Sequence, residues 1–517
     1  QCTLYVPAIV ASVYQSASYW NWFQIVGTDI IPENIIVNRT ITVDWPEGIG
    51  TTFKPNVAIT NSQYNTEQFG SLTINGNSTI SMNNFNILWD SRRSEWYSTY
   101  NEQTGSSEPY RFAYASLIAN APMRADNVSV SLNTNTYRWN FLTFPFDVKV
   151  GDIINLNQTN APLVIRRYDG KNRAEGKMGE TWVDMTPDMT LEAGKGYIWQ
   201  SAEGDQNNSE NDFSVPALDN AKKNNIFTAN DVTVQLEENL SEFSWNRSWN
   251  LIGNPYPAFY DIRAMQTTAP ITIWNVNNQV YQAYVPGDDN YILNPGQAFF
   301  IQRPLDQESI TFLKEGRQAN LVVRDEIGGN VTRAAKNSER FVFNLILTGS
   351  EEKQGDRTRI VFNAEAKSDY EAGRDASKFM SPEASAAQIF TTVGDLRYAI
   401  NERPAMDGIV ELGLSIGTAG SYTIALNTMV ENEVFLIDRE TGNETRIDGG
   451  STYTFYANKG NFEGRFALRF GNGEVTGIKA IASDSNNADN WYNLKGQRVN
   501  APTKGLYIQN GKKTVVK

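Results

Sequence analysis

The stretch Ser248–Pro257 reads SWNLIGNPYP, and the earlier stretch Arg138–Phe146 reads RWNFLTFPF. Each contains a Trp-Asn pair, continues with apolar residues and ends at proline, which suits the end of a strand better than the centre of a sheet. Each is followed by a second apolar element, AGKGYIWQ at Ala193–Gln200 and PGQAFFIQ at Pro295–Gln302. The same order with a small difference in spacing indicates a duplicated β-domain, because the extra residues fit in loops.

The region before this repeat has the alternation typical of short strands. Within Gly70–Ile87, Asn-rich turns separate three apolar pairs, Leu72 with Ile74, Ile80 with Met82, and Phe85 with Ile87. Because successive side chains of a strand point to opposite faces, the members of each pair face the same core. The pattern predicts stacked β-rungs or a β-meander and does not distinguish between them.

The region after the repeat predicts a β-sandwich. Arg340–Leu347 and Arg357–Phe362 are expected to pair across the charged turn Glu351–Asp356. Further strands follow at the regular intervals of a sandwich, at Val410–Leu414, Ser421–Leu426, Val434–Asp438, Thr452–Ala457 and Arg465–Phe470. Asp369–Ala387 is the one later stretch whose pattern indicates a helix.

The composition limits the classes of function. The net charge of −13 and the sequence pI of about 4.8 argue against nucleic-acid binding. The chain has no histidine, which excludes Ser-His-Asp and Cys-His catalysis and every His-ligated metal site within it. Cys2 is the single cysteine, so no disulfide forms within the chain. No apolar run approaches the roughly 18 residues that a membrane helix needs.

The last stretch, Trp491–Lys517, has two strand-like runs separated by Asn510-Gly511, the strongest short hairpin signal. It is basic in an acidic chain, and by composition alone it predicts a small terminal hairpin with a solvated face. Its segments YNLKGQRV, PTKGLYI and NGKK, in this order, resemble the C-terminal sorting signal of the type IX secretion system of Bacteroidetes. The residues of the signal are Gly496, Arg498, Gly505, Tyr507, Gly511, Lys512 and Lys513. The resemblance implies export through the periplasm, with the outer-membrane secretion machinery as partner.

The opening of the chain, Cys2–Pro7, predicts a short strand closed by proline, and the apolar residues of Val13–Val26 recur at helical spacing. This order resembles the closing unit of a BspA-like leucine-rich repeat surface protein of Bacteroidetes. The resemblance implies that repeats precede Gln1 and that this unit docks on the next domain or is poorly ordered. In that family the repeats carry adhesion to host proteins or other bacteria.

No motif gives a convincing active site, and we expect a protein that is not an enzyme. Two acidic loops offer the hard oxygen ligands that calcium prefers, although solvated turns explain them as well; their carboxylates are Asp205, Asp212, Asp288 and Asp289. A second group of charged residues is explained more simply by ion pairs than by catalysis, and it comprises Asp375, Glu402, Asp407, Arg374 and Arg403. We expect no other cofactor.

Five tryptophans remain as candidates for binding or packing. Trp182, Trp199 and Trp274 could form a platform on which sugars stack, whereas Trp139 and Trp249, duplicated in duplicated strands, are expected in the core.

These patterns predict a mainly β chain of several β-sandwich or β-meander domains in series, with a short N-terminal strand–helix unit. The expected divisions are a repeat-like unit at 1–29, a β-rung or β-meander domain at 30–130, the duplicated β-domain at 131–325 with repeats at about 137–203 and 247–304, a β-sandwich at 338–470, a linker at 471–490 and the sorting signal at 491–517. The function expected from the resemblances is that of the non-catalytic stalk or spacer of an extracellular or surface-bound adhesin, with an unknown host or bacterial ligand. The alternative is a carbohydrate-binding or carbohydrate-degrading surface protein, which exposed aromatic rings beside carboxylates would favour.

Overall fold

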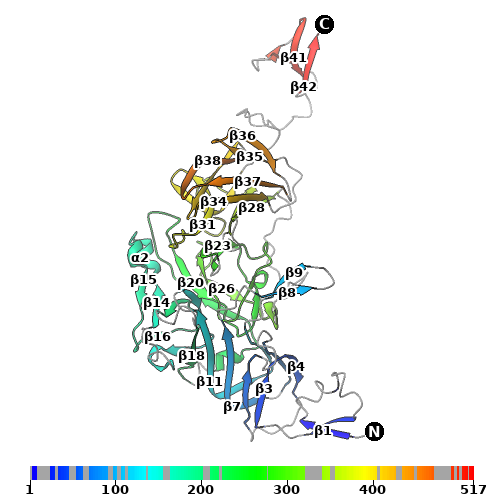
Figure 1. Cartoon of the computed structure of the whole chain (residues 1–517), viewed down its shortest axis with the longest axis vertical. Coiled ribbons are helices and arrows are strands. Elements are labelled where there is room, and N and C mark those ends of the chain that lie inside the picture. The colour runs from blue at the N-terminus through cyan, green and yellow to red at the C-terminus, as the bar shows by residue number, and fades with distance from the viewer. Residues whose placement is uncertain are drawn as a thin grey trace. The chain divides into compact units, whose positions relative to one another are not determined.

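The computed structural model is mainly β, as the sequence predicts, with its strands in several sheets (Figure 1). The described residues fall into two compact units, within Gln1–Gly471 and within Asn472–Lys517. None of the described helices is long and apolar enough to cross a membrane. The structure describes residues 3–7, 15, 24–28, 33–45, 54–61, 69–77, 79–90, 97–101, 106–110, 114–135, 138–154, 163–201, 210–219, 224–275, 278–320, 340–349, 355–404, 408–426, 434–447, 451–470, 491–493, 498–499, 503–509 and 512–516.

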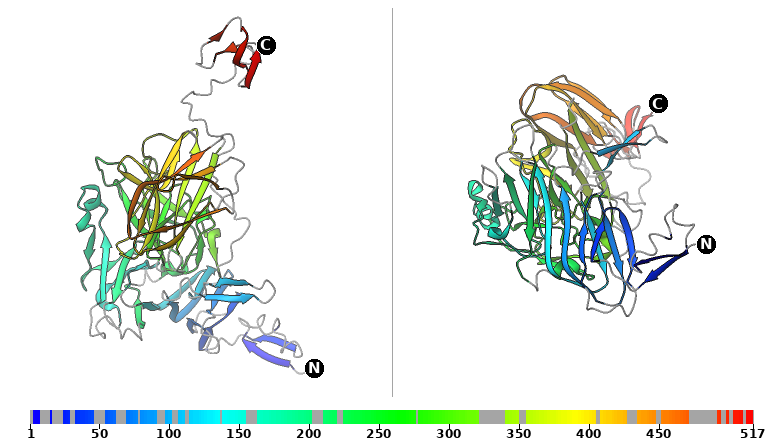
Figure 2. Two further views of the ribbon diagram at one scale, coloured as in Figure 1. Left: turned by 45° about the horizontal axis from the view of Figure 1, so that its top comes forward. Right: turned by 60° about the horizontal axis from the view of Figure 1, so that its bottom comes forward.

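Residues 34–135 form a solenoid of stacked parallel strands (Figure 2). The chain alternates between two sheets, so that each coil adds one strand to each sheet. One sheet contains β3 (Asn34–Val37), β5 (Asn56–Ile59), β7 (Ile80–Asp90) and β11 (Met123–Asn135), and the other contains β4 (Thr40–Asp44), β6 (Ser71–Asn75) and β10 (Ser116–Asn120). The strands are therefore stacked rungs and not a meander, whose neighbouring strands would be antiparallel. A hairpin of β8 (Tyr97–Asn101) and β9 (Ser106–Tyr110) is inserted between β7 and β10.

Two kinds of stacking hold the rungs in register. Inside, Val37, Ile59, Ile87 and Val130 lie opposite one another in successive strands and are buried, which accounts for the apolar alternation of the sequence. Outside, asparagine side chains form ladders, in which the Nδ2 of each residue donates to the Oδ1 of the residue one rung earlier. One ladder runs from Asn127 through Asn84 and Asn56 to Asn34, and the other from Asn120 through Asn75 to Asp44. The Asn-rich stretches are therefore structural ladders as well as turns.

The duplicated sequence forms two modules with the same strand order. The first module has the sheet β12–β17–β14–β15 and the second has the sheet β20–β25–β22–β23. Phe141 lies opposite Ile198 in the first sheet, as Leu251 lies opposite Phe300 in the second. The strands of the first sheet are β12 (Asn140–Leu142), β17 (Tyr197–Ser201), β14 (Leu163–Tyr168) and β15 (Trp182–Asp184), and those of the second are β20 (Trp249–Gly253), β25 (Ala298–Gln302), β22 (Ile271–Asn275) and β23 (Val280–Tyr284).

The smaller elements of the two modules also correspond. In each module a short strand is followed by a 3-10 turn and later pairs with a second short strand. In the first module these are β13 (Val148–Lys149), η2 (Val150–Asp152) and β16 (Thr190–Leu191), and in the second they are β21 (Phe259–Asp261), η5 (Ile262–Ala264) and β24 (Ile292–Leu293), with β27 (Arg317–Gln318) added beside β21.

The two modules contact each other through equivalent residues. The backbone N–H of Thr143 donates to Gly296 (2.9 Å), and the N–H of Gly253 donates to Gly194 (3.1 Å). Thr143 and Gly253 are equivalent in the repeat, as are Gly194 and Gly296, so the modules are related by an approximate two-fold axis. An aromatic layer that includes Phe141 and Phe300, 6.0 Å apart, is buried between their sheets.

Residues 340–470 form one sheet of 11 strands that curves back on itself, so that β36 and β37 at its two ends contact each other. The expected pairing of 340–347 with 357–362 is present, since β28 and β29 form an antiparallel pair. The strands are β28 (Arg340–Gly349), β29 (Gly355–Asn363), β30 (Ala376–Ser377), β31 (Ala387–Val393), β32 (Leu396–Arg403), β33 (Ile409–Ile416), β34 (Gly420–Leu426), β35 (Val434–Asp438), β36 (Asn443–Ile447), β37 (Thr452–Ala457) and β38 (Gly460–Phe470).

One helix prediction was wrong, and a second was wrong at its C-terminal end. Asp369–Ala387 contains no helix, because its apolar residues face different partners: Tyr370 bonds to Gln302, and Phe379 packs on Trp249 with ring centroids 4.6 Å apart. In the opening unit, the predicted helix overlaps a strand, β2 (Gln24–Thr28), whose residues pair in parallel with β1 (Thr3–Pro7). The β-branched Ile25 and Val26 suit this pairing. Gln15, the other described residue of Val13–Val26, is helical as predicted, and the remaining residues lie outside the described part of the chain.

The equivalent glycines Gly296 and Gly194 provide a matched test of the packing. Both have positive φ, 70° and 75°, so alanine costs about 1–2 kcal/mol of backbone strain at either position. A Cβ at Gly296 would also lie 2.5 Å from Cζ3 of Trp89, whereas at Gly194 the nearest atom is 3.5 Å away. We expect Gly296→Ala to lose about 1–3 kcal/mol more than Gly194→Ala through overpacking. Calorimetric melting of both variants measures the difference, and equal losses would contradict the contact with Trp89.

Candidate functional site

The terminal unit is a small antiparallel sheet in the order β40–β39–β41–β42. Its strands are β39 (Trp491–Tyr492), β40 (Arg498–Val499), β41 (Gly505–Gln509) and β42 (Lys512–Val516). Gln509 pairs with Lys512, so the predicted hairpin pairing of the two runs is confirmed, while Asn510 and Gly511 between them lie outside the described residues. The rings of Trp491 and Tyr507 meet edge to face with centroids 6.2 Å apart, which gives this four-stranded sheet an aromatic contact of its own.

Five of the seven predicted sorting-signal residues lie in this sheet. Arg498 is in β40, Gly505 and Tyr507 are in β41, and Lys512 and Lys513 are in β42. β40 and β42 are the two edge strands, where main-chain groups are available for pairing with another chain. Gly496 and Gly511 lie outside the described residues.

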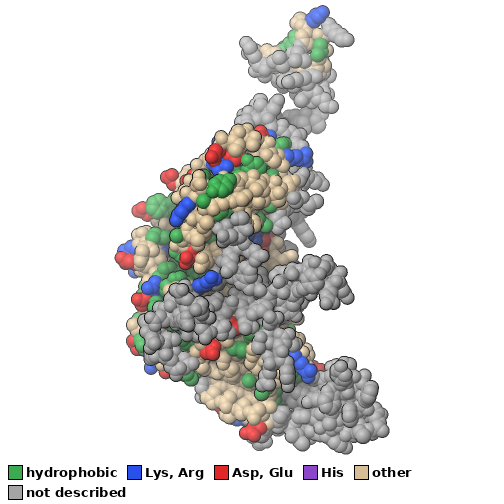
Figure 3. Space-filling model, viewed as in Figure 1, with side chains coloured by type: hydrophobic (Ala, Val, Ile, Leu, Met, Phe, Trp, Pro, Cys, Tyr) green, Lys and Arg blue, Asp and Glu red, His purple; other side chains and the backbone are tan. Residues whose placement is uncertain are grey.

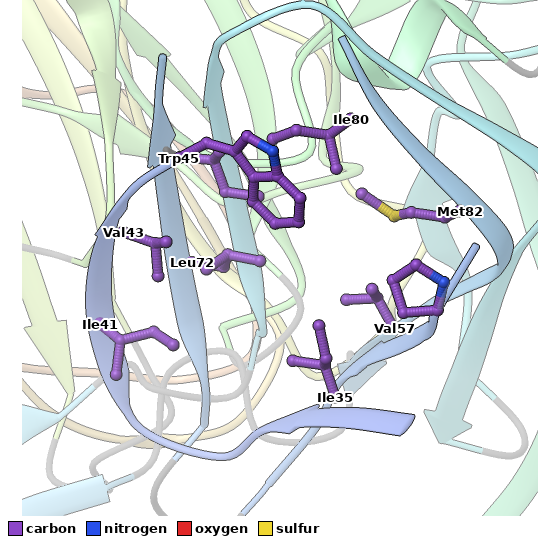
Figure 4. A pocket seen from close by; sticks show the side chains of 10 residues that line it. Ile35, Ile41, Val43, Trp45, Val57, Leu72, Ile80 and Met82 are labelled. Atoms are coloured by element: carbon purple, nitrogen blue, oxygen red, sulfur yellow. The ribbon is translucent and has the colours of Figure 1, made fainter. Parts of the chain in front are cut away.

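An apolar pocket lies at the N-terminal end of the solenoid, where its two sheets meet (Figure 4). Its free volume is about 20 Å³ and its lining atoms are all apolar, so it is a gap in the end of the core and too small for an organic ligand. The edge strand β3 beside it also exposes Ile36 to 65%. Its lining residues are Ile35, Ile41, Val43, Trp45, Pro55, Val57, Leu72, Ile74, Ile80 and Met82.

The carboxylates Asp375 and Glu402 are brought together under the second module. Asp375 accepts the backbone N–H of Glu402 and of Glu371, both at 2.8 Å. Glu402 accepts hydrogen bonds from Asn363 (2.8 Å) and Arg374 (2.7 Å). Burial raises the pKa of Asp375 to about 7, and the neighbouring Glu402 and Glu371 add to this.

These contacts give the pair a structural role. Asp375 and Glu402 are both buried, and the bonds that both oxygens of Asp375 accept fix the turn Glu371–Asp375 against β32, while Oε2 of Glu402 lies 3.9 Å from Arg340. Arg403 is half-buried at the end of β32, and Asp407 lies outside the described residues. The pair therefore holds the turn Glu371–Asp375 against β32, which is a structural role, as the ion-pair interpretation of the sequence predicts.

The calcium candidates Asp288 and Asp289 contact arginines of the 11-stranded sheet. Asp288 lies 2.6 Å from Arg340, and Asp289 lies 2.6 Å from Arg359 and 3.2 Å from Arg357. A cation at these oxygens would face the positive charge of three guanidinium groups. The loop Pro286–Asn290 thus joins the second module to the sheet. Asp212 lies on the exposed side of a strand, β18 (Glu210–Pro216), and Asp205 lies outside the described residues.

The tryptophans expected to form a sugar platform are in the core. Trp199 and Trp274 are 1% and 7% exposed, and Trp182 packs against the aromatic layer between the modules. They do not form a stacking platform, because Trp182 and Trp274 belong to the aromatic layer between the modules, whereas Trp199 packs on the other face of its sheet against Phe144 and Phe213. Trp249 is buried as predicted, whereas Trp139 is only half-buried, with the guanidinium of Arg166 5.2 Å from its ring.

Two features of the structure could not be predicted from the sequence patterns: an arginine pair that contacts another module, and an aromatic loop. Arg357 and Arg359 are two positions apart, so they point to the same face of β29, but their partner loop lies in another module. An aromatic pair, the exposed Phe243 and the half-buried Trp245, lies in a loop that no pattern had singled out, with ring centroids 4.9 Å apart. Figure 3 shows acidic and basic side chains interspersed over the described part of one face, without a basic patch.

Comparison with models of protein families gives a match over part of the chain. A family model described as a domain of unknown function, DUF8693, matches residues 259–470. The matched region begins at β21 and ends at β38, so it covers most of the second module together with the 11-stranded sheet. The chain matches none of the curated proteins.

The raised pKa of Asp375 predicts a dependence of stability on pH. Between about pH 4 and 7 the folded protein holds a proton on Asp375 that the unfolded chain has released, so this group makes stability fall as pH rises. We expect wild type to lose stability relative to Asp375→Asn over this range. Melting temperatures from pH 4.5 to 8 measure the difference, with Asp184→Asn, at an exposed carboxylate, as the control. A constant offset between wild type and Asp375→Asn would contradict the prediction.

Proposed function

We propose that this chain belongs to a secreted or cell-surface protein exported by a type IX secretion system, and that it forms the non-catalytic stalk or spacer of an adhesin. The observation that carries the proposal is the terminal unit. The sequence that resembles the sorting signal folds as a compact sheet of its own, with two edge strands. A receptor could therefore bind it without disturbing the 11-stranded sheet that precedes it.

The contacts that connect the successive parts of the larger unit support the role of a stalk. The sheet of the solenoid continues into the first module through β18, which pairs with β11, and the two modules exchange backbone hydrogen bonds. The second module is joined to the 11-stranded sheet by the buried Asp289–Arg359 pair. Such contacts fix one part against the next, which suits a spacer that holds a binding region away from the cell.

The export proposal is tested with the tail alone. Residues 472–517 are fused to a reporter enzyme that carries a periplasmic signal peptide, in a Bacteroidetes strain and in a matched strain without the type IX pore. We expect the reporter on the surface or in the medium of the first strain only. A fusion that lacks 491–517 is the control. Equal export from both strains, or none from either, would reject the proposal.

A second candidate, carbohydrate binding, is favoured by the exposed aromatic loop. Leu240 and Phe243 are 74% and 50% exposed, and Phe243 packs on Trp245 in a tilted arrangement beside the exposed carboxylate of Glu242. Gln302 holds the loop through the backbone oxygens of Ser244 (2.6 Å) and Arg247 (2.8 Å). Rings fixed in this way present an apolar face on which a sugar can stack.

A glycan array tests this second candidate. We expect wild type to bind a set of glycans, and Phe243→Ala and Trp245→Ala to bind them at least tenfold more weakly. Tyr456→Ala removes an aromatic side chain that is 64% exposed elsewhere and should bind like wild type. Absence of binding by wild type, or equal losses in all three variants, would refute carbohydrate binding by this loop.

A further inference from the structure

The approximate two-fold symmetry of the modules is broken at one pair of equivalent strands. In the first module, β11 pairs with β18 along one edge and with β7 of the solenoid along the other. The equivalent strand of the second module, β19 (Val232–Gln235), pairs with β26 (Ser309–Phe312) and with no other described strand.

The chain order shows that the two strands correspond. Each comes before the first strand of its module's sheet, β12 or β20, and each pairs antiparallel with the strand that follows β17 or β25. In the solenoid, Trp89 of β7, the strand beside β11, lies against Gly296. Its counterpart would therefore lie beside β19, against Gly194.

The second edge of β19 has main-chain groups available for pairing. The N–H of Leu236 donates to Glu308 of the neighbouring chain segment (2.8 Å), so by strand alternation Val234 also directs its backbone groups toward β26. Thr233 and Gln235 then direct their N–H and C=O groups the other way. Among the described residues, no backbone group bonds to them from that side.

A cavity of about 390 Å³ lies along this edge. It is lined by β19 itself, by the turn Ala193–Lys195 of the first module and by the equivalent prolines Pro145 and Pro255. The approximate two-fold axis allows this cavity to be compared with the equivalent place in the other module. At Gly296 a Cβ would collide with the ring of Trp89, whereas at the equivalent Gly194 the nearest atom is Val234, 3.5 Å away. The place that Trp89 takes on one side of the axis is an open cavity on the other.

We propose that the free edge of β19 and this cavity bind an extended strand of a partner polypeptide, which places a large aromatic side chain beside Gly194. The bound strand runs parallel to β19, as β7 runs parallel to β11. Main-chain hydrogen bonds to Thr233 and Gln235 supply affinity, and the cavity, whose volume is within the range of ligand pockets, selects the side chain.

The strand that takes the equivalent place, β7, supplies the probe. A fluorescent peptide with the sequence of Asn84–Asp90, NFNILWD, is titrated with the full chain and its anisotropy is measured. We expect saturable binding, and at least tenfold weaker binding of the same peptide with the change Trp89→Ser. Absence of binding at millimolar concentration, or equal binding of both peptides, would overturn the proposal.

Variants of the chain locate the bound peptide. Thr233→Pro removes an outward-facing N–H, which an edge strand tolerates, and Ala193→Trp fills the cavity with a side chain of the protein itself. We expect both to retain the melting temperature of wild type and to weaken binding at least tenfold, while Thr233→Ala binds like wild type. If Thr233→Pro does not fold, peptide binding by Ala193→Trp alone decides whether the proposed site is correct. Unchanged binding by a folded Thr233→Pro or Ala193→Trp variant would overturn the proposed site.

Discussion

The backbone hydrogen bonds that the two modules exchange are the constraint on which the larger unit depends. Thr143 bonds to Gly296 and Gly253 bonds to Gly194 at equivalent places. Because both bonds use positive-φ glycine turns, neither module can slide along the other without losing both. The aromatic layer between the sheets is buried as a result. The first module is then held on the solenoid through β18. The second module bonds to the solenoid as well, since the N–H of Leu117 donates to Pro257 (2.7 Å), and it also contacts the 11-stranded sheet.

The contact between the second module and the 11-stranded sheet is of another kind. It is rich in buried charge: the fully buried Lys378 donates to the backbone oxygen of Tyr281 in β23 (2.8 Å) while it pairs with Asp356 of its own sheet, and Asp289 meets Arg359. Such pairs are costly to desolvate and gain strength only when their hydrogen bonds are complete, so they fix one arrangement more than they add stability. The family model that matches residues 259–470 includes both sides of this contact, which agrees with the two parts folding as a joint structure.

The sequence was most informative where a strand alternates between a buried and an exposed face. Val434–Asp438 and Thr452–Ala457 were predicted to the residue. Alternation is the same in parallel and antiparallel strands, so it could not separate rungs from a meander. The helix prediction at Asp369–Ala387 failed because that pattern reflected contacts with other modules. The cavity beside β19 needed the structure, since aligning the repeats marks Gly194 and Gly296 as equivalent but does not place Trp89 against one of them.

The ladders of asparagine side chains have a consequence for chemical ageing. Asn75 is followed by Gly76, the neighbour that least hinders attack of the backbone nitrogen on a side-chain amide. Asn75 donates from Nδ2 to the carboxylate of Asp44 at 2.9 Å. Hydrolysis of this amide would replace the donor by a second carboxylate and set two negative charges against each other at the end of the solenoid. Hydrogen bonding within the ladder holds the amide in place, so the stacking that orders the rungs also slows the reaction that would unstack them.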